Sequence, residues 1–194
     1  MKFRLFALVV GLSLTAVAAQ AQFGLYLNPI ATRVSNAQAD TGPFAFLGQN
    51  STSRMFYGVD MGGYYNFYQQ GKTEVGVDIR DAIQHGNSAS LNSFLVGIRV
   101  ATKPFSRPLK PYLQASVGVG TTRPPTSTVR VNRAQYGIFG GADYSLNRHV
   151  DFRVVEVGFN SLVTASSSTI GGSSSNFPAS KLLSISTGFV FRFR

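Results

Sequence analysis

Side-chain polarity along this chain alternates with a period of two, and this alternation constrains the fold more than any other feature. In the segment 73–80, apolar side chains alternate with Glu74, Gly76, Asp78 and Arg80. The same alternation recurs in 93–100, 113–120 and 182–194. Side chains of a β-strand point to opposite faces in turn, so each segment predicts a strand with one apolar face and one polar or small face. The chain is therefore expected to be all-β.

Four further segments follow the same pattern less regularly, which brings the total to about eight strands, an even number. They are 23–33, 55–68, 135–146 and 150–159. In the last of them the phase slips near Val154 and Val155, which indicates either a β-bulge or a strand end.

The connections between these strands are expected to alternate in length. Tight turns are predicted at 69–71 and 147–149, with a proline-rich connection at 102–109. Longer polar connections are predicted at 35–53, 81–89, 121–134 and 160–180. Short turns at one end and long polar loops at the other are typical of up-and-down barrels that span an outer membrane.

The first residues read as a secretory leader. Lys2 and Arg4 precede an apolar run over 5–19, and Ala19-Gln20-Ala21 supplies the small residues of a cleavage site before Gln22. The alternative is a membrane anchor, but the run is shorter than the roughly 20 residues that a spanning helix needs. We therefore expect a signal peptide over 1–21 and one barrel domain over 22–194.

Glycines and aromatic residues indicate which face of each strand meets lipid. Gly76, Gly97, Gly118 and Gly188 fall on the polar faces, where a narrow lumen needs small residues beside long ones. A soluble barrel would have the inverse arrangement, with an apolar lumen. Aromatic residues near the strand ends are expected to form two interfacial girdles: Tyr65, Phe67, Tyr112, Tyr144 and Phe193 at the turn end, and Tyr57, Phe94 and Phe159 at the loop end.

Charged residues on the polar faces should then lie inside the barrel. The candidates are Asp60, Glu74, Asp78, Arg80, Arg99, Asp143, Glu156 and Arg192, with Arg99 expected to pair with Glu74 or Asp78. Buried charges are costly unless paired, so we interpret them as a salt-bridge network that plugs the lumen. The alternative is a narrow ion path.

The mature chain resembles the small bacterial outer-membrane β-barrels related to the transmembrane domain of outer-membrane protein A. The segments that carry the resemblance are 136–144, 151–156 and the closing strand 186–193. The resemblance implies an eight-stranded antiparallel transmembrane barrel in the bacterial outer membrane. It also implies recognition by the barrel-assembly machinery through the terminal aromatic residues Phe189, Phe191 and Phe193.

Little in the sequence indicates catalysis. The chain has no cysteine and two histidines, His85 and His149, expected in loops at opposite ends of the barrel. Some barrels of this size are lipid-modifying hydrolases, and His85 with Ser88 resembles their His–Ser pair only loosely. We predict no catalytic, cofactor-binding or metal residues and no enzymatic activity, with a lipid-modifying hydrolase or a narrow channel as alternatives.

The charge balance points to anionic partners. The formal charge of +10 includes Lys2 and Arg4, so the mature chain carries +8. The basic residues are scattered singly, which argues against nucleic acid. We expect a monomer with a structural or surface-interaction role, in which Arg123, Arg130 and Arg133 contact lipopolysaccharide or a surface partner. A soluble periplasmic barrel remains an alternative.

Overall fold

The structure is a computed structural model that describes residues 22–40, 45–102, 108–125, 128–163 and 179–193. Among these residues there is no helix that is long and apolar enough to cross a membrane. The predicted leader, 1–21, lies outside the described residues, and its cleavage stays a prediction.

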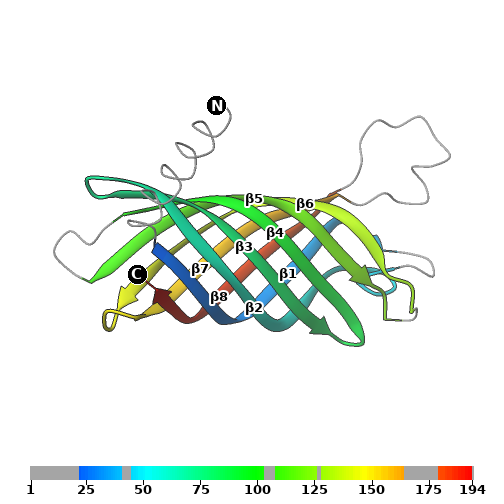
Figure 1. Ribbon diagram of the computed structural model, residues 1–194. Helices are drawn as coiled ribbons and strands as arrows, with labels where there is room; N and C mark the ends of the chain where they lie inside the picture. Colours follow the sequence, from blue (N-terminus) through cyan, green and yellow to red (C-terminus); the bar gives the residue numbers. More distant parts are fainter. Residues whose placement is uncertain (1–21, 41–44, 103–107, 126–127, 164–178, 194) are drawn as a thin grey trace, which may run out of the picture.

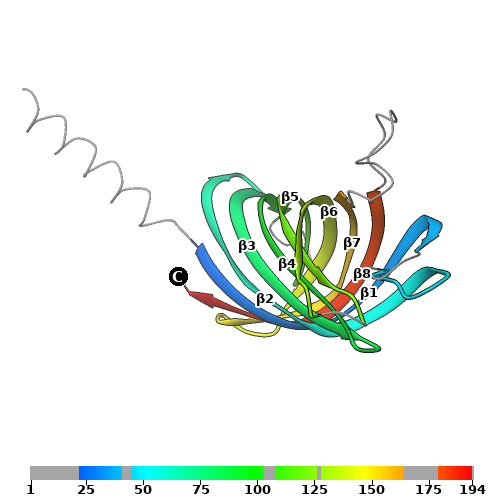
Figure 2. The ribbon, with the colours of Figure 1, turned by 90° about the vertical axis from the view of Figure 1, so that its right-hand side faces the viewer.

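Eight antiparallel strands form one closed barrel, in which each strand pairs with the next and the last pairs with the first (Figure 1). The strands are β1 Gln22–Asp40, β2 Ser51–Gln70, β3 Thr73–Gly86, β4 Ala89–Thr102, β5 Leu109–Arg123, β6 Val131–Ser145, β7 Val150–Val163 and β8 Ala179–Phe193. Figure 2 shows the strands curving around a common axis. The predicted eight-stranded up-and-down barrel is confirmed.

The alternation read from the sequence separates the inside of the barrel from the outside. On β8, Leu182, Ser184 and Ser186 are buried while Leu183 and Ile185 are exposed. The exposed large side chains of all eight strands are predominantly apolar, and most buried ones outside the loop end are polar or aromatic. The barrel therefore has an apolar outer wall and a polar interior, as the positions of the glycines predicted.

Irregularities of strand pairing occur at three places, one of them between Ser35 and Asp40, where the pairing of β1 with β2 shifts. On β7, Val154 and Val155 both point outward, and the pairing with β8 shifts between Arg153 and Glu156. On β2, the pairing with β3 shifts between Asn66 and Tyr68. The shift on β7 confirms the phase slip seen in the sequence as a bulge, which brings Arg153 and Glu156 to the same, inner face.

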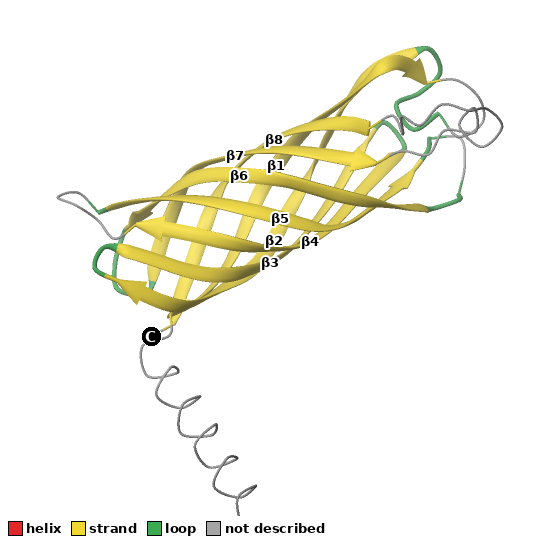
Figure 3. Cartoon of the chain, turned by 90° about the horizontal axis from the view of Figure 1, so that it is seen from above, coloured by secondary structure: helices red, strands yellow, loops and turns green. Residues whose placement is uncertain are grey.

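The two ends of the barrel differ (Figure 3). The start of β1, the end of β8 and the turns β2–β3 and β6–β7 lie at one end, which we call the turn end; the opposite end is the loop end. The strands extend further toward the loop end than predicted: β1 continues to Asp40, and β5 and β6 extend into the predicted connection 121–134.

The prediction of a long loop over 81–89 is wrong. β3 continues to Gly86 and β4 starts at Ala89, so only Asn87 and Ser88 form the turn. Their φ angles are 45° and 66°, which is the backbone of a tight hairpin turn whose twist matches that of the strands. The polar composition of this segment suggested a loop. Cross-strand pairing nevertheless continues to Gly86, because the side chains of 81–86 still alternate between the inside and the outside of the barrel.

The seam between the first and last strands is closed by aromatic residues. Phe23 on β1 pairs with Phe193 on β8, and their ring centroids are 5.8 Å apart. Phe193 is 53% exposed on the outer wall, so its ring contributes through this contact and through lipid.

Replacing Ser88 with glycine should stabilise the hairpin. Ser88 has a positive φ, which glycine adopts without the steric cost of a Cβ atom, and Asn-Gly is the preferred sequence of this turn. We expect Ser88→Gly to raise the free energy of unfolding in detergent by about 0.5–1 kcal/mol, measured by urea titration. Ser88→Val should lower it; a gain from valine would contradict the turn assignment.

Deleting Phe193 together with Arg194 should lower the yield of folded barrel much more than deleting Arg194 alone. The longer deletion removes the ring that meets Phe23 and the last outward aromatic of the closing strand. The measurement is the folded fraction by heat-dependent gel mobility. Equal yields from the two truncations would show that this residue is not part of the closure or assembly signal.

Candidate functional site

All eight charged residues predicted to face the lumen are buried there: Asp60, Glu74, Asp78, Arg80, Arg99, Asp143, Glu156 and Arg192. Two further buried charges, Asp151 and Arg153, were missed. The sequence carried a signal for Arg153, because a bulge at Val154–Val155 places it on the same face as Glu156. Asp151 follows from Arg153 by the period of two.

Glycines on the inner faces make room for aromatic rings on neighbouring strands. Three lumen tyrosines lie directly opposite a glycine in the strand pairing: Tyr64 opposite Gly24, Tyr26 opposite Gly62 and Tyr112 opposite Gly141. A Cβ atom at any of these glycines would overlap the tyrosine side chain. The glycines therefore let the rings lie flat against the wall of the barrel.

The arginines stack on these rings. The Arg99 guanidinium lies 4.2 Å from the ring centroid of Tyr64 and 4.3 Å from that of Tyr112. Arg153 lies 4.6 Å from the centroid of Tyr26 and 4.9 Å from that of Tyr112. Stacking leaves the edges of each guanidinium free to donate hydrogen bonds in its own plane.

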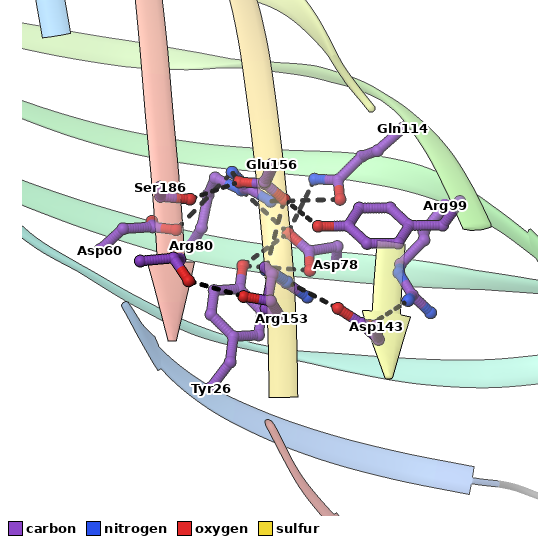
Figure 4. A network of polar contacts seen from close by, with 12 residues as sticks. Tyr26, Asp60, Asp78, Arg80, Arg99, Gln114, Asp143, Arg153, Glu156 and Ser186 are labelled. Atoms are coloured by element: carbon purple, nitrogen blue, oxygen red, sulfur yellow. Dashed lines mark hydrogen bonds and ion pairs between the residues drawn. The ribbon is translucent and has the colours of Figure 1, made fainter. Parts of the chain in front are cut away.

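Carboxylates occupy those edges. Arg80 donates from both terminal nitrogens to Glu156, at 2.8 and 3.1 Å, and from Nε to Asp78 at 3.3 Å (Figure 4). Glu156 also accepts a hydrogen bond of 2.6 Å from the Tyr112 hydroxyl and one of 3.3 Å from Arg153. This two-point pairing is the strong geometry for a guanidinium and a carboxylate.

Arg99 does lie in the lumen, but its predicted partners are wrong. It donates to Asp143 on β6 at 3.0 Å, not to Glu74 or Asp78. Asp143 also accepts from Arg153 Nε at 2.9 Å, so one carboxylate joins two arginines (Figure 4). Glu74 instead accepts from the Asn66 amide at 3.0 Å. The partner lies two strands away, on β6, rather than on the adjacent strand β3, which strand order alone does not indicate.

Asp60 is the least paired member of this lumen network. Its side chain is 0% exposed, and its closest cation is Arg80 at 3.8 Å. Neither of its carboxylate oxygens has a hydrogen-bond partner among the described residues. The central network holds four carboxylates, Asp60, Asp78, Asp143 and Glu156, against three arginines, Arg80, Arg99 and Arg153. Asp60 is thus the carboxylate in excess of the arginines of this network.

A second charge cluster closes the turn end of the lumen. Asp151 forms an ion pair with Arg192, with Nε 2.7 Å from a carboxylate oxygen, and accepts a hydrogen bond from Lys110 Nζ at 3.2 Å. Arg192 also donates to the backbone carbonyl of Asn147 in the β6–β7 turn at 2.8 Å. These contacts connect the closing strand to the neighbouring turn.

The loop end of the lumen is closed differently, by an apolar plug. Its members are Val34, Phe46, Leu47, Phe56, Ala89, Leu91, Leu162 and Leu182, all buried. Phe46 and Leu47 come from the β1–β2 connection, and Phe46 stacks on Phe56 with centroids 5.1 Å apart. Between the plug and the charge network, a cavity of about 20 Å³ remains, enough for about one water molecule.

The histidines are not assembled into a catalytic group. His85 lies exposed on β3, paired across strands with Tyr57 and Ser90, whereas Ser88 lies in the hairpin turn. None of the hydrogen bonds among the described residues joins His85 to a serine or a carboxylate. His149 lies in the β6–β7 turn at the other end. The part of the chain that the structure describes holds no group of three metal-ligating side chains.

The outer wall carries the predicted aromatic girdles with one exception. Tyr65, Phe67, Tyr144 and Phe193 at the turn end and Tyr57, Phe94 and Phe159 at the loop end are all exposed. Tyr112 is wrong as a girdle residue: it is 6% exposed and points into the lumen, because it occupies the inward phase next to the outward Leu113.

Comparison with known proteins agrees with this geometry. No protein-family model matches the chain, and no curated protein is significantly similar to it in sequence. The crystal structure of Neisserial surface protein A is similar, with a TM-score of 0.58 and 13% identity, over 88% of this chain and 97% of that one. Ail, the attachment invasion locus protein of Yersinia pestis, is similar with a TM-score of 0.52 and 9% identity, over 89% and 99%.

The chain has the fold of the small outer-membrane β-barrels. This fold and an outer wall of apolar side chains together place the protein in the bacterial outer membrane. The closed barrel satisfies the backbone without water, as a lipid-embedded sheet requires.

Two substitutions should separate the well-paired from the poorly paired carboxylates of the lumen. Glu156→Gln leaves Arg80 and Arg153 without their shared anion, and should cost about 3–5 kcal/mol of unfolding free energy. Asp60→Asn removes a buried charge that makes no hydrogen bond, and should change the free energy of unfolding by less than about 1 kcal/mol. Urea unfolding in lipid vesicles measures both. Equal losses would mean that Asp60 is as well stabilised as Glu156.

Proposed function

We propose that this protein is a monomeric, non-enzymatic barrel that anchors in the outer membrane and presents a basic loop end to anionic groups at the cell surface. The surface partner with the fitting chemistry is lipopolysaccharide, whose phosphates lie at the outer face of the membrane. The observation that carries the proposal is the way the fold separates acidic from basic side chains.

The lumen takes up most of the acidic residues of the chain. The whole sequence has eight acidic residues, and six of them are buried inside the barrel: Asp60, Glu74, Asp78, Asp143, Asp151 and Glu156. The two that remain are Asp40 and Asp81. Five basic residues, by contrast, lie in the lumen network or its turn-end cluster: Arg80, Arg99, Lys110, Arg153 and Arg192. Of the thirteen basic side chains that the structure describes, the other eight lie outside these two clusters.

Several of these basic residues gather at the loop end. Arg33 on β1, Lys181 on β8 and Arg130 before β6 are exposed, and Arg54 and Arg123 are half-buried. Within the described ranges, none of these five forms a salt bridge. Arg123 was expected to contact a surface partner, but it also donates to Ser90 Oγ and the carbonyl of Ser88, both at 3.3 Å. Arg54 donates to the carbonyls of Gly86 and Asn87, so both arginines also support the β3–β4 turn.

A surface hollow beside Arg54 combines charge with apolar surface. It has a volume of about 670 Å³ and is lined by Arg54, His85 and Ser88 together with the exposed Met55 and Tyr57. Met55 and Tyr57 lie toward the girdle, and Arg54 lies toward the end of the strand. A cationic group above an apolar one suits a phosphorylated headgroup above its acyl chains.

The filled lumen supports an anchoring role over conduction. A path for ions would have to pass the apolar plug at one end and the Asp151–Arg192 pair at the other. The cavity between them has room for about one water molecule. The exposed, unassembled His85 likewise favours a binding role over hydrolysis.

The experiment is binding of the folded barrel to immobilised lipopolysaccharide. The triple variant Arg33→Gln, Arg130→Gln, Lys181→Gln removes three exposed charges that make no described ion pair. At about 1 kcal/mol for each charge, we expect it to bind on the order of 100-fold more weakly at low salt. Added salt should weaken binding of the unmodified protein for the same reason.

Two controls make the result specific. Lys72→Gln with Arg148→Gln removes charge from the turns at the opposite end and should leave binding unchanged. Dephosphorylated lipopolysaccharide should bind as weakly as the triple variant does. If the triple variant binds as tightly as the unmodified protein, the basic loop end is not the contact surface.

A further inference from the structure

The small cavity between the apolar plug and the charge network is lined by buried oxygen atoms that lack partners. Its volume is about 20 Å³. Asp60 lines it, and neither carboxylate oxygen of Asp60 has a hydrogen-bond partner within the described ranges. Five more lining side chains each have one unpartnered hydroxyl or amide oxygen: Thr32, Gln84, Ser93, Gln135 and Asn160. All six side chains are more than nine-tenths buried, where unpaired polar atoms are costly unless a ligand satisfies them.

The strand pairing explains why charged and polar groups border one space here. On β3, the inward Ala82 lies opposite Asp60 of β2 on one side and opposite Ser93 of β4 on the other. All three residues line the cavity. Because the side chain of Ala82 is a single methyl group, the Asp60 carboxylate and the Ser93 hydroxyl border the same space from two different strands.

The charge balance favours a cation in this cavity over a water molecule. The central network holds one carboxylate more than it holds arginines, and Asp60 is that carboxylate. Arg80 also lines the cavity, but it donates from Nε to Asp78 and from both terminal nitrogens to Glu156 (Figure 4). Asp60 is left with an ion pair of 3.8 Å. One added positive charge would neutralise the network, whereas a water molecule would leave the excess charge buried.

We propose that the cavity binds one dehydrated alkali metal ion, sodium or potassium, with Asp60 as its anionic ligand and the hydroxyl and amide oxygens as its neutral ligands. Protein oxygens of this kind replace the hydration shell of an alkali metal ion. A cavity with room for about one water molecule admits a bare ion but not magnesium, which keeps several of its waters. A divalent ion would also leave the network with an excess of positive charge.

This site is independent of the proposed function, because it lies inside the barrel and the basic surface lies at the loop end. The apolar plug lies between the cavity and the loop end, so the ion is taken up as the barrel folds and is released when it unfolds. The effect of the ion on the folding equilibrium therefore measures its binding.

The test is urea unfolding of the barrel in detergent at constant ionic strength. Sodium chloride is replaced stepwise by N-methyl-D-glucamine chloride, whose cation is too large for the cavity, and a potassium chloride series runs in parallel. For a single site, each tenfold rise in ion concentration above the dissociation constant raises the ratio of folded to unfolded protein about tenfold. The unmodified protein should show this dependence with sodium, with potassium or with both.

Two variants should abolish the dependence. Asp60→Asn removes the anionic ligand, so the ratio of folded to unfolded protein should no longer respond to either ion. The small effect of Asp60→Asn predicted above applies to buffer without these ions, and the difference from the unmodified protein should grow as sodium or potassium is added. Ala82→Val fills the cavity while it keeps the carboxylate, and should remove the response as well.

Glu74→Gln is the matched control. It also removes one buried carboxylate from the lumen, but Glu74 lies outside the lining of the cavity and accepts its hydrogen bond from Asn66. This variant should keep the tenfold response of the unmodified protein. Heat-dependent gel mobility confirms that each variant is folded.

Three outcomes would overturn the proposal. An unmodified protein whose folding equilibrium depends on neither sodium nor potassium would leave the cavity to water. A response that persists in Asp60→Asn would place the ion elsewhere. A response to calcium chloride alone would show that the site takes a divalent ion.

Discussion

Pairing of three buried arginines inside a narrow lumen is the constraint on which the rest of this barrel depends. A guanidinium group does not lose its charge in a protein, so each of these arginines needs neighbouring carboxylates and an aromatic ring on which to stack. The three are Arg80, Arg99 and Arg153. The barrel provides both. Tyrosine rings that lie against glycines stack on the guanidinium groups of Arg99 and Arg153, and the ring of Phe139 stacks on that of Arg80. Carboxylates from other strands pair with the edges of these groups. The contacts join residues far apart in sequence, and thereby fix the strands around one centre.

The burial of carboxylates in the lumen affects the charge of the outer surface. Because six of eight acidic residues are used inside, few are left to balance the arginines and lysines outside. The basic surface that we propose for binding anionic lipid is therefore a consequence of how the core is stabilised. Asp81 is the exception, because it lies on the outer wall among the apolar side chains of Met61, Ile79, Ile83 and Phe94.

Two different kinds of side chain fill the interior of the barrel along its axis. In the membrane-embedded part the filling is ionic and aromatic, whereas at the loop end it is an apolar plug completed by Phe46 and Leu47. The strands extend toward the loop end beyond the predicted bounds, and there the interior resembles the core of a water-soluble domain. The two kinds of filling leave room for about one water molecule between them, which supports the anchoring role that we propose over conduction.

The sequence by itself determined the architecture and the orientation of nearly every strand residue. Strand side chains alternate strictly, so the period of two assigned the lumen charges and the lipid-facing wall without knowledge of the register. Even the bulge at Val154–Val155 was visible as a slip of phase. What only the tertiary structure decided were the partners. Arg99 pairs with Asp143 two strands away on β6 rather than with a residue on β3, Tyr112 lies under two arginines, and 81–89 forms a tight hairpin. These depend on strand register, on closure of the barrel and on which side chains meet across its axis, and no local pattern encodes those distances.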